Sequence, residues 1–274
     1  MERCWFSLSK KPRIVPIIHR YEDSWVRVTG HPKHGIATIY DQDLLIYVIA
    51  QYMHALNLPN ADPNTLSPRF LFTGYDFYNF TGKKRLSGKG YSDLWSRLER
   101  LHHTFVETNI RQGIARTNYS FNWLSAIKQV QRNGRHRGFE IVLPHWLYDS
   151  VIKGKMVLTL DNGYFDINSG LERWLYLFAR KAAGYQTSGW MESIESLHAK
   201  SGSTASIASF KRQVKKIVER GSFLGYDVSM DENTEFTYKP GIHFLRDSEL
   251  TKLTSTGRKR RGAIPYRKTI LPSF

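Results

Sequence analysis

The sequence has 274 residues, enough for one large domain or two of ordinary size. With 41% apolar and 14% aromatic residues the chain can bury hydrophobic cores, which excludes global disorder. Lys and Arg number 40 against 24 Asp and Glu, and the resulting charge of +16 indicates a polyanionic partner. The single cysteine, Cys4, excludes an internal disulfide or a thiolate metal site. No apolar run reaches the roughly 18–20 residues of a membrane span, so we expect a cytoplasmic protein without a membrane partner.

The positive charge is concentrated at one end but not confined to it. Residues 251–274 carry seven Lys or Arg and no acid, whereas residues 1–250 still carry a net +9. We therefore expect a basic, flexible tail at 251–274, attached to a body that is basic in its own right.

The first half of the sequence has the element order of a winged helix, in which three helices precede a β-hairpin. Apolar residues at helical spacing follow Asp41, which is placed to cap that helix. The expected elements are helices at 41–54, 75–80 and 91–101, a turn at 87–90, strands at 70–72, 104–110, 119–124 and 139–143, and a basic turn at 133–138.

The second half repeats this order. Residues 157–167 predict a hairpin with an Asn162-Gly163 turn. Helices are expected at 171–183, 190–198 and 203–220, with a turn at 201–202 and wing strands at 225–228 and 235–238. We expect an α+β protein with two tandem winged-helix domains, each a helical bundle with a small antiparallel wing, at 1–145 and 146–250.

Residues 81–101, TGKKRLSGKGYSDLWSRLERL, contain the ingredients of a phosphate-binding loop. The P-loop pattern is G-x-x-x-x-G-K-[ST]. Here Gly88-Lys89 is followed by Gly90, which has no hydroxyl for a magnesium ion, and Lys83 stands where the first glycine belongs. The glycines are better explained as a turn before a helix, and we expect no nucleotide cofactor.

No catalytic or metal-binding constellation is visible. His102 and His103 are sequence neighbours, and on a helix they point in different directions. His31 and His34 flank a proline in a loop. The His-x-His ligands of a rolling-circle nickase are absent, so we expect a protein that is not an enzyme, with no metal site, although a spatial triad is not excluded by sequence.

The two third helices have an apolar face and a face of Ser, Arg and Lys, as a major-groove helix requires. The alternative is a solvated helix face, which Asp93 and Glu99 favour for residues 91–101. The candidate DNA-binding residues on the helices are Lys89, Ser92, Ser96, Arg97, Arg100, Ser203, Ser206, Ser209, Lys211, Arg212, Lys215, Lys216 and Arg220. Candidate phosphate contacts on the wings and tail are Arg132, Arg135, Arg137, Lys239, Arg258, Lys259, Arg260 and Arg261.

Four stretches resemble the plasmid replication initiator protein A family: HGIATIYDQDLLIYVIAQ, PHWLYDSV, GYFDINSGLERWLYLFARKAAG and SLHAKSGSTASIASFKRQVKKI. The similarity runs from about residue 3 to 228. It implies a bacterial tandem winged-helix initiator, associated with plasmid DNA, that binds repeated origin sequences (iterons) as a monomer. It also implies repression of its own gene as a dimer and recruitment of host helicase machinery. A transcriptional repressor without a replication role would use the same fold and surface, and an origin nickase is the third alternative.

Overall fold

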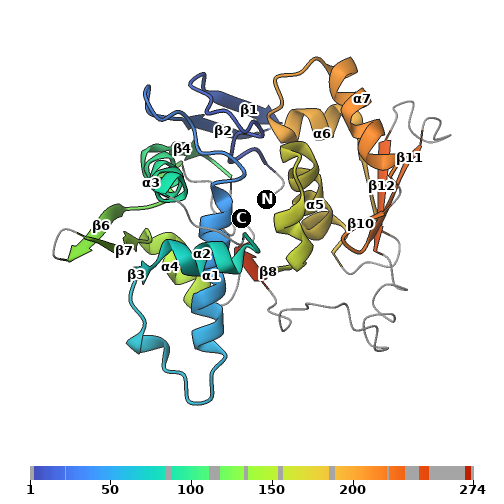
Figure 1. Ribbon diagram of the computed structural model, residues 1–274. Helices are drawn as coiled ribbons and strands as arrows, with labels where there is room; N and C mark the ends of the chain where they lie inside the picture. The colour runs from blue at the N-terminus through green and yellow to red at the C-terminus, as the bar shows by residue number, and fades with distance from the viewer. Residues whose placement is uncertain are drawn as a thin grey trace. The chain divides into compact units, whose positions relative to one another are not determined.

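The computed structural model describes residues 3–21, 23–83, 88–110, 118–132, 135–153, 157–184, 189–220, 222–231, 241–246 and 269–272 (Figure 1). The chain forms two compact units. The N-terminal unit comprises Trp5–Thr159 with Thr269–Phe274, and the C-terminal unit comprises Met1–Cys4 with Leu160–Lys268. The chain thus passes from the N-terminal unit into the C-terminal unit at Leu160 and returns at Thr269.

The N-terminal unit contains a winged-helix-like set of elements. Three helices are followed by a two-stranded wing, and a short strand after the first helix pairs with the second wing strand. Leu71 lies opposite Glu140 in that antiparallel pairing. The elements are α1 (Gln42–Leu56), β3 (Arg69–Phe72), α2 (Gly74–Phe80), α3 (Gly88–His103), β6 (Ala126–Arg132) and β7 (Arg135–Val142), with sheet order β3-β7-β6.

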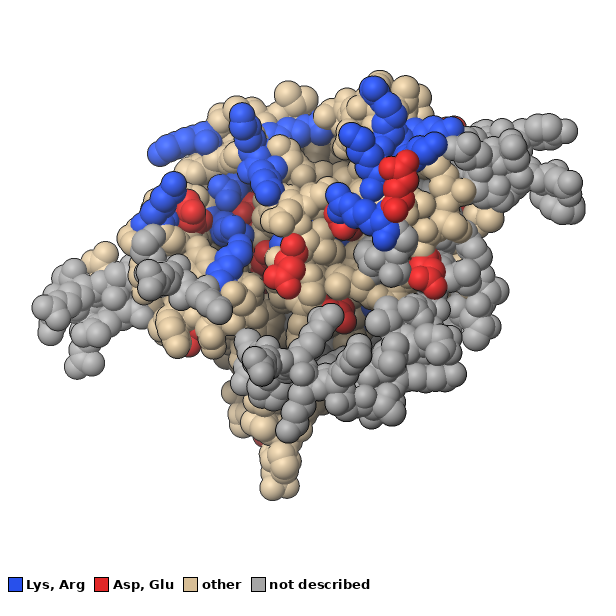
Figure 2. Space-filling view, turned by 45° about the vertical axis from the view of Figure 1, so that its right-hand side comes forward, with Lys and Arg blue, Asp and Glu red and all other residues tan. Residues whose placement is uncertain are grey.

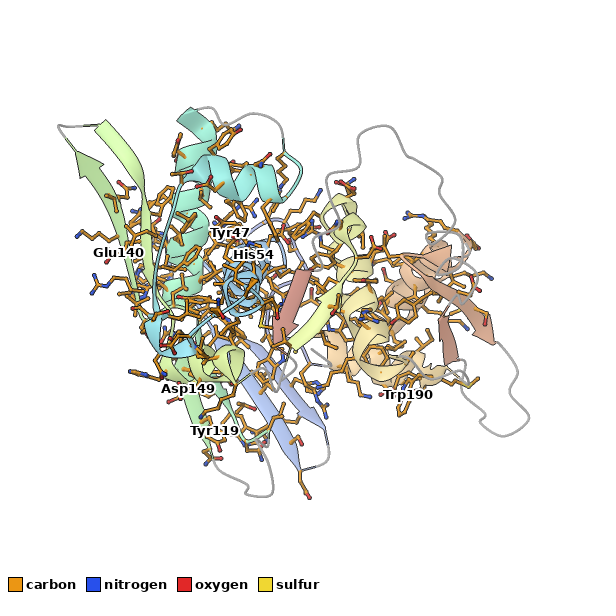
Figure 3. All side chains as sticks on the ribbon, turned by 90° about the horizontal axis from the view of Figure 1, so that it is seen from below. Tyr47, His54, Tyr119, Glu140, Asp149 and Trp190 are labelled. Atoms are coloured by element: carbon orange, nitrogen blue, oxygen red, sulfur yellow. The ribbon has the colours of Figure 1, made fainter. Side chains whose placement is uncertain are left out.

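Apolar spacing and capping explain these helices. On α3 the buried residues are Leu94, Leu98 and Leu101, at steps of four and three along one face. At α2, Thr73 and Asp76 form a reciprocal capping box. Tyr47 of α1 (Figure 3) stands at the centre of the core, where four ring centroids lie 5.2–6.0 Å from its own, those of Phe70, Phe72, Phe77 and Phe80.

A second sheet is added to this set. Two of its strands precede α1 and two lie between α3 and the wing, and its inward face buries Val26, Val28 and Val106 completely. The strands are β1 (Ile17–Tyr21), β2 (Ser24–Thr29), β4 (Phe105–Thr108) and β5 (Tyr119–Asn122), in the order β1-β2-β4-β5. The unit also includes η1 (Pro63–Thr65), α4 (His145–Ile152), β8 (Val157–Leu160) and β13 (Thr269–Pro272), and β8 pairs with β13.

The C-terminal unit repeats the element order of the first. A helix, a strand, two helices and three strands follow one another, and the strand after the first helix again pairs with the last strand. The elements are η2 (Asn162–Asp166), α5 (Gly170–Ala182), β9 (Trp190–Ser193), α6 (Ile194–Ser201), α7 (Ile207–Val218), β10 (Ser222–Phe223), β11 (Tyr226–Asp231) and β12 (Gly241–Arg246), with sheet order β10-β11-β12-β9.

The two compact units have different limits from the domains expected from the sequence. Residues 146–159 were expected in the second domain, but α4 and most of β8 belong to the N-terminal unit. The tail was expected to be flexible throughout, but β13 at its far end forms a strand. The rest of the tail, 251–268, lies outside the described residues, as does the wing strand expected at 235–238.

Four local expectations were wrong. No hairpin forms at 157–167, because Asp161 caps the 3-10 helix η2 by accepting a hydrogen bond from the Gly163 amide at 2.7 Å. Residues 190–193 form β9 before the helix, because they pair with β12. The helix expected at 203–220 begins at Ile207, after its cap Ser206. The turn expected at 87–90 is largely the first turn of α3. The strand β6 was missed altogether.

Candidate nucleic-acid interface

The helix α7 is held in place by its cap and by the turn before it. Gly202 ends α6 in the left-handed region at φ 65°, where glycine is favoured. The ring of His198 contacts the Ala205 carbonyl through Nε2 at 2.7 Å and lies 5.0 Å from the ring of Phe210. Ser206 caps α7 by accepting a hydrogen bond from the Ser209 amide at 3.3 Å. The sequence therefore fixes the direction in which α7 leaves the turn.

The outward face of α7 carries exposed basic side chains. Phe210, Val214 and Ile217 are buried, and Arg212 and Lys216 are exposed on the opposite side of the helix. Lys211 is half-buried, Lys215 is exposed, and Arg220 just after the helix pairs with Glu172 at 2.9 Å. Within the described part of the chain, Lys211, Arg212 and Lys216 form no ion pair. Figure 2 shows Lys and Arg side chains gathered over the region of α7.

The three candidate serines near α7 have mainly structural roles. Ser203 lies in the turn and accepts a hydrogen bond from the Ala205 amide at 3.3 Å, while Ser206 is the helix cap. Ser209 is half-buried on the first turn, with the Gln213 amide 3.5 Å from its hydroxyl. The arginine and lysines, and not the serines, therefore dominate the exposed surface of this helix.

A largely buried ion pair supports α6 beneath α7. The Lys200 ammonium donates to Glu192 of β9 at 2.8 Å and lies 5.5 Å from the ring centre of Phe178 on α5. Burial opposes ionisation of Glu192, but hydrogen bonds from Lys200 and from the Trp190 indole outweigh that penalty, so its pKa lies below the ordinary value. Lys200 therefore links α6 to the strand β9 and to the helix α5.

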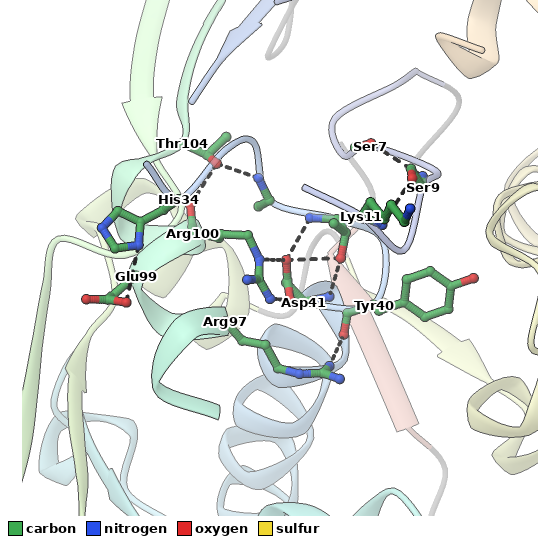
Figure 4. A network of polar contacts seen from close by, with 12 residues as sticks. Ser7, Ser9, Lys11, His34, Tyr40, Asp41, Arg97, Glu99, Arg100 and Thr104 are labelled. Atoms are coloured by element: carbon green, nitrogen blue, oxygen red, sulfur yellow. Dashed lines mark hydrogen bonds and ion pairs between the residues drawn. The ribbon is translucent and has the colours of Figure 1, made fainter. Parts of the chain in front are cut away.

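In the N-terminal unit the corresponding helix is α3, and its two arginines form hydrogen bonds within the unit (Figure 4). Arg100 donates from Nε and Nη2 to the two carboxylate oxygens of Asp41 at 2.7 and 2.8 Å, and Asp41 is 1% exposed. Arg97 donates to the Tyr40 carbonyl at 2.6 Å. Burial alone would lower the pKa of Arg100, but the hydrogen bonds and charge of Asp41 raise it, so the Arg100 guanidinium stays charged.

Asp41 has a different role from the one its position suggests. It occupies the cap position of α1 but makes no capping hydrogen bond with its side chain. Its carboxylate instead accepts hydrogen bonds from the Thr38 amide and hydroxyl at 2.8 and 3.0 Å, in addition to those from Arg100. Asp41 thereby ties α3 to the segment that precedes α1, with bidentate geometry that is among the strongest in proteins.

The remaining outward face of α3 is close to neutral. Lys89 and Ser92 are exposed and Ser96 is half-buried, while Asp93 is exposed beside them. Glu99 lies 3.3 Å from Nδ1 of His34. The structure therefore does not bring Arg97 and Arg100 together with the other predicted contacts, and α3 presents little net charge to a polyanion.

Most of the DNA contacts predicted on the wings and the tail lie outside the described residues. Arg132 lies at the end of β6, and Arg135 and Arg137 lie on β7, but their side chains are outside the described residues. Backbone and side chain alike lie outside the described residues for Lys239, Arg258, Lys259, Arg260 and Arg261. Sequence reasoning missed one exposed cation of the wing, Lys128, because the AIKQVQR sequence of β6 has no strict apolar-polar alternation and its strand was not predicted.

Four histidines cluster at the end of α3. The rings of His31, His34 and His103 are 5.0–5.5 Å apart between centroids, and His102 lies 4.9 Å from His103. In the described residues no group of three or more His, Cys, Asp or Glu is arranged to hold a metal ion. No helix in that part of the chain is long and apolar enough to cross a membrane.

Comparison with known proteins identifies the family. The family model described as "Replication initiator protein A" matches residues 1–228. The chain belongs to this replication initiator family. A protein of Wigglesworthia glossinidia brevipalpis described as "Putative replication protein" is 33% identical over 198 residues, which are 71% of this chain and 70% of that protein.

Two solved structures share the fold. A selenomethionine structure of domains 2 and 3 of RctB has a TM-score of 0.58 and 12% identity, covering 88% of this chain and 95% of that one. A second structure of the same RctB domains has a TM-score of 0.51 and 11% identity, covering 90% and 97%. At these identities the likeness concerns the fold alone, and it agrees with two winged-helix-like units built from helices and antiparallel sheets.

Proposed function

We propose that this initiator is a non-enzymatic protein that binds double-stranded DNA in a sequence-specific way, at repeated sites in a plasmid origin. The observation that carries the proposal is the outward face of α7, where a capped and supported helix presents Arg212, Lys215 and Lys216 to solvent. A rigid helix with this charge fits the major groove, where Arg reads guanine and Lys contacts phosphates. Membership of a replication initiator family supports a target at an origin.

The positions of residues along α7 indicate which of them would read bases and which would contact phosphates. Ala208, Arg212 and Lys216 are four residues apart and exposed, so they form one outward row. Successive members are separated by about 6 Å along the helix axis, close to two base-pair steps. Ala208 is small enough to let the helix approach the bases, and we assign guanine reading to Arg212. Lys211, Lys215, Lys216 and Arg220 are then phosphate contacts.

The N-terminal unit contacts DNA in a different way in this proposal. Arg97 and Arg100 are taken out of the DNA-binding set, because both are bonded within the unit. Lys89 and Ser92 at the exposed start of α3, together with Lys128, Arg132, Arg135 and Arg137 of the β6–β7 wing, are proposed as phosphate contacts. Together the two units act as tandem winged-helix domains, of which only the C-terminal one reads bases through its third helix.

We further propose that binding to several repeats strains an adjacent AT-rich segment and helps to open it. Host replication proteins such as the helicase machinery would then be recruited. A dimer of the same chain would repress its gene and so limit copy number. All of this would take place in the bacterial cytoplasm on plasmid DNA.

The test is footprinting of the purified protein on the DNA that flanks its gene. Regularly spaced protected repeats are expected, and protection of one operator alone would favour a repressor. Deleting the gene from the plasmid is expected to abolish plasmid maintenance. If the protein were only a repressor, the plasmid would persist without the gene. Supercoiled origin DNA incubated with magnesium or manganese is expected to stay supercoiled. A nicked product would contradict the proposal in favour of a nickase.

A further inference from the structure

The outermost strand of the additional sheet, β1, presents apolar side chains to solvent. Ile17 and His19 point inward and are 2% and 5% exposed, whereas Ile18 between them is 65% exposed. Ile14 and Val15, just before the strand, are 61% and 66% exposed. Contiguous exposed aliphatic residues on a folded domain mark interaction sites. We call Ile14, Val15, Ile18 and the free side of β1 the β1 edge surface.

This exposure belongs to a fixed segment. The guanidinium of Arg13 donates to the Val15 and Pro16 carbonyls at 2.8 and 2.9 Å. The Arg13 carbonyl in turn accepts a hydrogen bond from the Ile36 amide at 2.7 Å. The segment is therefore tied to the buried interior while its aliphatic side chains point outward, so a partner would lose little conformational entropy of the protein on binding.

The strand itself offers a place for another strand. In the sheet order β1-β2-β4-β5 the strand β1 is an edge, and among the described residues its sheet neighbour is β2 alone. An edge strand leaves a row of backbone N–H and C=O groups facing outward, which an extended peptide can pair with. On the outer face, Ile18 lies opposite Arg27, which pairs with Glu107 at 3.4 Å.

The charge around this edge decides what can occupy it. Residues 10–20 contain Lys10, Lys11, Arg13 and Arg20 and no Asp or Glu, and Lys10, Lys11 and Arg20 are exposed. A second copy pairing through β1 would bring two such sets together within about 10 Å, the distance over which charges repel at 0.1 M salt.

We propose that the β1 edge surface binds an extended, acidic segment of a partner protein, which adds to the sheet as a fifth strand beside β1. Aliphatic residues of that segment cover Ile14, Val15 and Ile18, and its carboxylates face Lys10, Lys11 and Arg20. DNA would meet the cations but leave the aliphatic side chains without a partner. The residues of this surface lie in the N-terminal unit and are different from those of α7 in the C-terminal unit.

The test uses a fluorescent peptide with capped ends and the sequence EVEIEVE, titrated with the full chain and followed by anisotropy. The substitution Ile18→Asp is expected to weaken binding at least about tenfold, the effect of losing one buried aliphatic side chain. The matched control is Leu71→Asp, because Leu71 is 60% exposed on β3, an edge of the other sheet in the same unit. That control is expected to bind the peptide within about twofold of the wild type, since exposed positions away from a site change little.

Three results would overturn the proposal. The first is that the wild type does not bind the peptide, or that Ile18→Asp and Leu71→Asp weaken peptide binding equally. The second is a dimer of the free chain, seen by sedimentation, that Ile18→Asp dissociates, because the edge would then belong to a second copy. The third is a loss of duplex affinity with Ile18→Asp as large as the loss of peptide affinity, which would assign the surface to DNA. Unchanged circular dichroism of both variants is the folding control.

Discussion

The third helices of the two units, α3 and α7, hold the same place in the element order but use their positive charges in opposite ways. On α3, Arg97 and Arg100 are bonded to Tyr40 and Asp41 within the unit. On α7, Arg212 and Lys216 are exposed and have no ion pair among the described residues. The basic face of an amphipathic helix is therefore available to a polyanion only where tertiary structure leaves its cations without acidic partners.

The difference arises partly within the helices, since α3 contains Asp93 and Glu99, and partly outside them. Asp41, which neutralises Arg100, lies 59 residues earlier in the chain. The only residue of α7 and its C-terminal cap that bears a negative charge is Glu219, and that side chain is exposed. The two helices thus differ both in the acids of their own sequences and in the acidic residues that surround them.

The largest expected effect concerns the ion pair of α3. Asp41→Asn leaves Arg100 largely buried with its charge uncompensated, and removing one partner of such a pair costs about 3–5 kcal/mol of unfolding free energy. Urea denaturation followed by tryptophan fluorescence measures the loss. The ratio of specific to non-specific DNA affinity of the folded variant is expected to stay unchanged. A fall in that ratio at constant stability would return Arg100 to the DNA-reading residues.

The second effect concerns base reading by α7. Arg212→Ala is expected to weaken binding to the origin repeat by about 1–3 kcal/mol while changing binding to a scrambled duplex much less. Lys89→Ala, at the exposed start of α3, is the matched control and is expected to leave the ratio of the two affinities unaltered. Titrations on both duplexes measure this, and an unchanged ratio for Arg212→Ala would remove α7 as the reading helix.

The third effect separates phosphate contacts from base contacts on the same helix. Lys216→Ala is expected to weaken specific and scrambled duplexes alike and to reduce the slope of log affinity against log salt by about one. The measurement is a salt series on both duplexes. A slope equal to that of the wild type would mean that Lys216 contacts no phosphate.

The smallest effect is a pH dependence confined to the N-terminal unit. Partial burial lowers the pKa of His103, and His102, His31 and His34 lower it further, although Glu99 opposes them. Because the folded value lies below the ordinary value of about 6.5, the stabilisation is present above that value and is lost as pH falls through the folded pKa. His103→Asn is expected to lose less stability than the wild type between about pH 7 and 5, as measured by urea midpoints. Equal losses would show that His103 does not contribute.

The sequence predicted helices and their buried faces well, and it predicted side-chain roles less well. The spacing of Leu94, Leu98 and Leu101 indicated the face that α3 buries, because helical periodicity is a local property. The repeated order of elements was also visible, since turns and caps lie next to the helices that they delimit. The roles of Arg97 and Arg100 were not visible, because their partners come from a distant segment.

The strands were harder to predict for the same reason. Residues 190–193 form β9 by pairing with β12, and residues 269–272 form β13 by pairing with β8. Neither segment has a local pattern strong enough to specify a strand. The Asn162-Gly163 pair predicted a hairpin, but the Asp161 side chain took the Gly163 amide and produced a 3-10 helix.

The pairing of β8 with β13 also has a consequence for how the protein is made. β8 is synthesised about 110 residues before its partner, at translation rates of roughly 5–20 residues per second. The ribosome therefore releases the strand that completes the N-terminal unit roughly 5–20 seconds after β8 has been made. During that interval the whole segment Leu160–Lys268 is synthesised, so the first unit to begin folding is the last to be finished.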